Sequence, residues 1–174
     1  MGPRLLALYL LACDPASPCP VGTGLDPQRA ARLAALVGLA EAGAVCFGPG
    51  VEASVEAAVD GRGRVRLDAT WPDAAAAARL LHLRLHGDPH PAGAGCLEAA
   101  LAEEGRAGQA ELEARRRLGA LDGPGSPPFV AVWGARPTPA TIEAWLRAHP
   151  AGAPTVPASL ERLAARCAEA PAPP

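Results

Sequence analysis

The chain has 174 residues, a formal net charge of -2 and 49% hydrophobic residues, but only three Trp, one Tyr and two Phe. The small net charge argues against a nucleic-acid partner, because nucleic-acid binding needs a strongly basic surface. The length suits one ordinary domain. With so few aromatic side chains, its core must come from Leu, Val and closely packed Ala-rich helices.

Residues 1–13 have the pattern of an export signal that ends in a cysteine. One basic residue, Arg4, precedes the apolar run Leu5–Ala12, and Cys13 follows directly. The segment Leu10-Leu11-Ala12-Cys13 resembles the lipobox of bacterial lipoproteins. The resemblance implies cleavage before Cys13, acylation of its thiol and a lipid anchor in a membrane of the bacterial cell envelope, facing the periplasm or the exterior. The alternative is an unprocessed first element of a cytosolic domain.

Composition divides the chain into four parts. Residues 1–12 are predicted to be a signal peptide, and residues 13–25 a lipidated tether, because this stretch is rich in Pro, Gly and Ser. Residues 26–169 are predicted to form a single globular domain. The proline-rich residues 170–174 are predicted to be a disordered tail.

Four cysteines remain after Cys13: Cys19, Cys46, Cys96 and Cys167. An even number of thiols in an oxidising compartment allows two disulfides, in any of three pairings. Their spacings match no zinc-ribbon pattern. Cys46 lies in an apolar run, where a buried free thiol is an equal alternative.

The first half of the domain is predicted to mix helix and sheet. Asp26 is a good N-cap for a helix that runs to Gly43. Ala44–Phe47 has the pattern of a short buried strand. Val51–Val59 and Arg64–Asp68 flank a glycine-rich turn, which predicts a hairpin.

The second half is predicted to be largely helical. A strand is expected at Phe129–Trp133, and helices at Thr138–His149 and Ala158–Ala168. The fold class is therefore α+β and mainly helical, with four or five helices. A small sheet of three or four strands is expected to pack on a central buried helix, Ala74–His86.

That central helix carries the residues of greatest functional interest. Its leucines surround most of the circumference, so the helix is expected to be buried. His82 and His86 lie four residues apart, where two imidazoles can reach one cation. The alternative is a pair of buried histidines that make hydrogen bonds and hold no metal.

The sequence His82-Leu83-Arg84-Leu85-His86 resembles the His-Glu-x-x-His motif of zinc metallopeptidases, and the resemblance spans residues 45–118. In that family the Glu takes a proton from the metal-bound water, and Leu83 cannot do so. The resemblance therefore implies a catalytically degenerate domain that holds zinc without hydrolysing peptides efficiently.

The same resemblance implies a third ligand from the following helix, Cys96–Leu118. Glu111 is the first choice and Glu104 the second. The alternative for the acidic residues of this helix is a solvated charged face that suits the helix dipole.

Three functions follow from these observations. The first is a non-catalytic, lipid-anchored envelope domain without a cofactor, which binds an envelope protein or a cell-wall partner. The second is a metal-binding, catalytically degenerate metallopeptidase-like domain that holds zinc through His82, His86 and Glu111. The third is a cytosolic helical domain that undergoes no processing.

Overall fold

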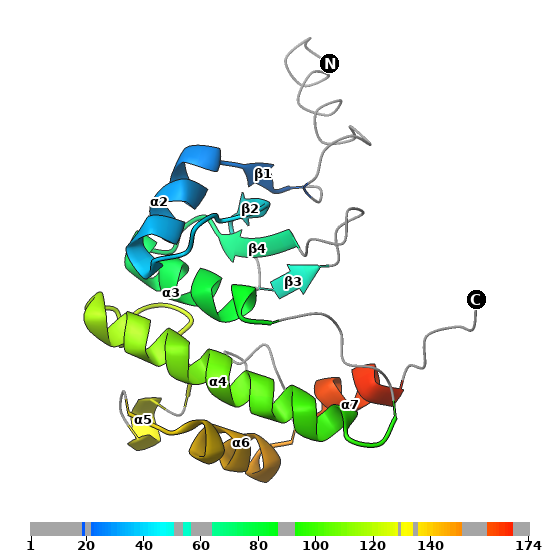
Figure 1. Ribbon diagram of the computed structural model, residues 1–174. Helices are drawn as coiled ribbons and strands as arrows, with labels where there is room; N and C mark the ends of the chain where they lie inside the picture. Colours follow the sequence, from blue (N-terminus) through cyan, green and yellow to red (C-terminus); the bar gives the residue numbers. More distant parts are fainter. Residues whose placement is uncertain are drawn as a thin grey trace, which may run out of the picture. The chain divides into compact units, whose positions relative to one another are not determined.

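The computed structural model describes residues 19, 22–50, 54–56, 64–86, 93–128, 130–133, 136–150 and 160–168. The predicted signal peptide, the lipobox with Cys13 and the predicted tail lie outside these residues. Contacts divide the chain into two compact units, a first unit of residues 1–71 and a second unit of residues 72–174 (Figure 1). The prediction of one domain over residues 26–169 stays a prediction.

The first unit contains a small mixed sheet and one helix. Its elements in chain order are β1 (Gly24–Leu25), α2 (Pro27–Val37), β2 (Val45–Gly48), β3 (Ser54–Glu56) and β4 (Arg64–Asp68). The strand order is β1-β2-β4-β3, with β2 and β4 parallel and the two edge strands antiparallel to their neighbours. The predicted hairpin is confirmed by the pairing of β3 with β4.

Helix α2 begins where the sequence predicts and ends earlier. The Asp26 side chain accepts a hydrogen bond from the backbone N–H of Arg29 at 2.9 Å, which caps the first turn. The helix ends at Val37, because Gly38 adopts a left-handed conformation with φ 73° and closes the last turn. The predicted end at Gly43 is therefore wrong.

A disulfide joins Cys19 to Cys46 on β2. The side chain of Cys46 is completely buried, and the alternative of a free thiol at this position is wrong. The pairing of β1 with β2 places Gly24 and Leu25 in the sheet. The last residues of the predicted tether thus belong to the folded unit.

The second unit is helical. It contains α3 (Asp73–Arg84), α4 (Cys96–Arg117), α5 (Val130–Trp133), α6 (Pro139–Ala148) and α7 (Leu160–Ala168). The long helix α4 packs against α3, α6 and α7 (Figure 1). The hydrophobic core of the second unit includes Ala100, Leu101, Leu112, Ile142, Trp145, Leu146 and Leu163.

The fold class predicted from the sequence is confirmed. In the described ranges, five helices have nine or more residues and one sheet has four strands. Burial of α3 is also confirmed, since its side chains from Ala75 to Leu80 are all buried. Small alanine side chains on this helix allow neighbouring elements to approach closely.

The strand predicted at Phe129–Trp133 is wrong, because residues 130–133 form the short helix α5. The backbone N–H of Val130 donates to Pro127 O at 3.1 Å, and that of Ala131 donates to Pro128 O at 3.2 Å. Proline has a fixed φ close to the helical value, so the two prolines favour the start of a helical turn.

A second disulfide joins Cys96, the first residue of α4, to Cys167 in α7. The two described pairs select one of the three pairings that the sequence allows. None of the helices in the described ranges combines the length and apolar character that a membrane span requires.

Candidate metal centre

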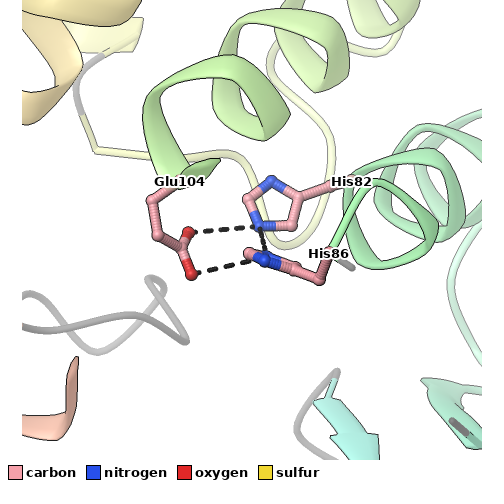
Figure 2. A group of neighbouring side chains, drawn as sticks. All are labelled: His82, His86 and Glu104. Atoms are coloured by element: carbon pink, nitrogen blue, oxygen red, sulfur yellow. Dashed lines mark hydrogen bonds and ion pairs between the residues drawn. The ribbon is translucent and has the colours of Figure 1, made fainter. Parts of the chain in front are cut away.

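His82 near the end of α3 and His86, two residues beyond the end of this helix, meet Glu104 of α4 in the second unit (Figure 2). The predicted helix end at His86 is therefore wrong, because α3 ends at Arg84. The Nε2 atoms of His82 and His86 lie 3.2 Å apart. Glu104 Oε2 lies 3.5 Å from His82 Nε2, and Glu104 Oε1 lies 3.4 Å from His86 Nε2. Two imidazole nitrogens and one carboxylate edge therefore converge on a single point.

The separation of the two imidazole nitrogens fits a tetrahedral metal ion. Ligands bound to tetrahedral zinc at about 2.0–2.1 Å are about 3.3 Å from one another. An octahedral ion with the same bond length would bring adjacent ligands to about 2.9 Å. The separation of 3.2 Å between the two Nε2 atoms is closer to the tetrahedral value.

Each imidazole turns its other nitrogen toward a second carboxylate. His86 Nδ1 lies 2.8 Å from Glu103 Oε1, and His82 Nδ1 lies 3.2 Å from Glu111 Oε2. Histidines that bind metals in proteins commonly donate their remaining N–H to a carboxylate or carbonyl in this way. Both imidazoles are thus oriented with Nε2 toward the candidate centre.

The structure separates the two acidic residues that the sequence offered as a third ligand. Glu104, the second choice, faces both Nε2 atoms. Glu111, the first choice, contacts His82 on the opposite nitrogen, Nδ1. Among the described residues, the group that can hold a metal consists of His82, His86 and Glu104.

Glu111 instead belongs to a buried cluster of charges that the sequence analysis did not identify. Arg115 Nε donates to Glu111 Oε1 at 2.8 Å, and Arg79 Nη1 lies 3.3 Å from Glu111 Oε2. Both guanidinium groups also donate to Gly125 O. The spacing of Glu111 and Arg115, one helical turn apart, is the sequence signal that could have revealed this pair.

The acidic groups around His82 change its proton affinity. Burial alone would lower the pKa of this imidazole, but the nearby carboxylates of Glu104 and Glu111 and their negative charges raise it to about 9. A metal ion at Nε2 must displace that proton, since a histidine ligand binds in its neutral form.

The pKa of Glu111 changes in the opposite direction. Burial alone would raise its pKa, but the positive charge of Arg79, followed by His82 and Arg115, lowers the pKa to about 2. Glu111 therefore remains a carboxylate at neutral pH and balances the buried positive charges around it.

The four side chains of the cluster differ in their exposure to solvent. The side chains of His82 and Glu104 are 8% and 7% exposed, whereas those of His86 and Glu103 are 19% and 16% exposed. Leu83, at the position of the glutamate in the metallopeptidase motif, is buried. His82, His86 and Glu104 thus form a largely buried site with an apolar residue, Leu83, next to one of its histidines.

Comparisons with protein-family models, curated proteins and solved structures found no match to this chain.

Proposed function

We propose that this protein binds a divalent transition metal, zinc in the first instance, through His82, His86 and Glu104. The observation that carries the proposal is the convergence of the two Nε2 atoms and one carboxylate at separations of 3.2–3.5 Å. Imidazole and carboxylate are suitable ligands for zinc, and three protein ligands leave one tetrahedral position for water or another small ligand.

The proposed role is binding rather than peptide hydrolysis. A zinc peptidase needs a base beside the metal-bound water, and Leu83 cannot serve as one. The carboxylates of Glu103 and Glu111 each contact the Nδ1 atom of a histidine, on the side away from the candidate metal position. This supports a metal-binding, catalytically degenerate domain.

Zinc binding can be tested with protein purified without a histidine tag, dialysed against chelator and then titrated with zinc. We expect one zinc per chain, measured by elemental analysis. His82→Ala and Glu104→Ala should abolish binding, whereas Glu113→Ala, on the exposed side of the same helix, should retain it. A wild-type protein that takes up no zinc at pH 7.5 contradicts the proposal.

We further propose that this metal-binding domain is anchored to the bacterial envelope by a lipid on Cys13. The lipobox-like sequence Leu10-Leu11-Ala12-Cys13 supports this location. The two disulfides also support it, because disulfides persist mainly in oxidising compartments. An envelope protein or a cell-wall component is then the expected class of partner.

The anchor can be tested in a bacterial host supplied with labelled palmitate. The wild-type chain should incorporate the label and lose residues 1–12, as read by mass spectrometry. Cys13→Ser should incorporate none, whereas Ser17→Ala, in the same segment, should be labelled normally. An unlabelled wild-type chain that keeps its first twelve residues contradicts the proposed anchor and leaves the zinc proposal unaffected.

A further inference from the structure

Glu111 links two buried arginines to the imidazole of His82. Its Oε1 accepts a hydrogen bond from Arg115 Nε at 2.8 Å. Its Oε2 lies 3.3 Å from Arg79 Nη1 and 3.2 Å from His82 Nδ1. The side chain of Glu111 has no exposed surface. Because two guanidinium groups hold the carboxylate, its orientation toward His82 is fixed.

The two arginines are themselves held in place. Arg79 Nη2 donates to Gly125 O at 2.7 Å, and Arg115 Nη2 donates to the same oxygen at 3.0 Å. Arg115 Nη1 also donates to Ala120 O at 3.2 Å. The backbone between residues 120 and 125 therefore braces the guanidinium groups that hold Glu111.

The contact between His82 Nδ1 and Glu111 Oε2 is within hydrogen-bond length but incompletely aligned. Both atoms are buried, and neither has a hydrogen-bond partner within the part of the chain that the structure describes. A buried donor and acceptor that face each other at 3.2 Å can satisfy each other by a small rotation of the ring. A hydrogen on Nδ1 leaves the lone pair on Nε2, the nitrogen that faces Glu104.

We propose that Glu111 is a positioning residue of the zinc site, which holds His82 in the tautomer with hydrogen on Nδ1 and so directs its Nε2 lone pair to the metal. This inference rests on the proposed function, because it concerns His82 as a zinc ligand. Glu103 makes the corresponding contact with His86 at 2.8 Å, but its side chain is 16% exposed. Water can therefore replace Glu103 more easily than Glu111.

The proposal is tested by measuring zinc affinity in competition with a chromogenic chelator. Glu111→Gln is expected to weaken zinc binding 10- to 100-fold, the range found when the carboxylate behind a histidine ligand is lost. Glu103→Gln should weaken it less. Glu113→Gln, on the exposed side of the same helix, should leave it unchanged within twofold. A Glu111→Gln protein that binds zinc within threefold of the wild type overturns the positioning role.

The wild-type control separates this inference from the proposed function. A wild-type protein that binds no zinc overturns both. A wild-type protein that binds one zinc, together with an unaffected Glu111→Gln variant, overturns the positioning role alone.

A second measurement needs no variant, and so remains decisive if Glu111→Gln does not fold. Long-range proton–nitrogen NMR of the zinc-loaded wild-type protein reports which ring nitrogen of His82 carries hydrogen. We expect a hydrogen on Nδ1 and zinc on Nε2. Zinc on Nδ1 overturns the proposal. A purely structural Glu111 would affect folding without selecting this tautomer.

Discussion

Arg115 and Glu111 form an ion pair one helical turn apart on α4, with 2.8 Å between Nε and Oε1 and no exposed side-chain surface on either residue. Such a pair contributes little net free energy compared with an apolar pair of the same size, but the loss of one partner leaves a buried charge uncompensated.

Removing the Arg115 charge should destabilise the protein strongly. Arg115→Met leaves Glu111 with one guanidinium group fewer and leaves the carbonyl oxygens of Ala120 and Gly125 without these donors. We expect the free energy of unfolding in urea to fall by about 3–5 kcal/mol. Arg116→Met, at an exposed neighbouring position, should change it by less than about 0.5 kcal/mol. Equal effects of the two substitutions would contradict the buried network.

Stability at acid pH should depend on Glu111. Its pKa is about 2 in the folded protein and has a usual value of 4.5. Glu111 binds fewer protons in the folded state, so its contribution to stability is fully present above pH 4.5 and is lost as the pH falls toward 2.

This pH dependence can be measured by urea unfolding of chelator-treated protein between pH 2 and 6. The wild type should lose more stability over this range than Glu111→Gln, which has no carboxylate to protonate. Parallel pH profiles for the two proteins would show that Glu111 does not carry the effect.

Gly105 should not tolerate alanine, although alanine normally favours a helix. Replacement of glycine by alanine in a helix interior normally stabilises the helix by up to about 1 kcal/mol. A Cβ atom at Gly105, however, would lie 2.8 Å from the backbone oxygen of Pro139 at the start of α6. Because a backbone atom cannot move aside cheaply, we expect Gly105→Ala to destabilise the protein by about 1–3 kcal/mol.

The control for this substitution is Arg106→Ala, at the next and exposed position of α4. It should change stability by less than about 0.5 kcal/mol. A Gly105→Ala protein with a higher melting temperature than the wild type would show that α4 and α6 are not in close contact.

The disulfide between Cys96 and Cys167 closes a loop with a sequence separation of 71 residues. In the chain-entropy model, a bridge across a loop of this length contributes roughly 4 kcal/mol by restricting the unfolded chain. The double variant Cys96→Ser, Cys167→Ser should unfold at correspondingly lower urea concentration. Peptide mapping of the unreduced wild type should recover the two cysteines in one linked fragment, and separate fragments would refute the pairing.

The sequence predicted the position of the candidate site better than its exact composition. The pairing of His82 with His86 follows from helical spacing, since residues four apart share one face, although α3 itself ends at Arg84. Glu104 and Glu111 are seven residues apart, close to two full turns, and so share one face of α4. Which of them is level with the Nε2 atoms depends on how far α4 is shifted along α3. That shift is set by packing, and periodicity carries no information on it.

The same limit explains the other differences between the structure and the elements predicted from the sequence. The run Phe129–Trp133 is too short for its period to distinguish strand from helix, and local bonds to Pro127 and Pro128 favour the helical turn. Arg115 lies in a run of three basic residues in the last turn of α4, a pattern typical of an exposed helix end. Its burial follows from the acidic residue one turn before it and from the carbonyl oxygens of residues 120–125, which only the folded chain brings together.

The burial of Leu83, which is 5% exposed, has a consequence for protein engineering. The substitution Leu83→Glu, which would create a His-Glu-x-x-His sequence, would transfer a carboxylate into an apolar interior, at a cost of several kcal/mol unless new partners were supplied. A designer seeking a hydrolase from this scaffold would therefore have to reshape the packing around α3 before a general base could be accommodated there.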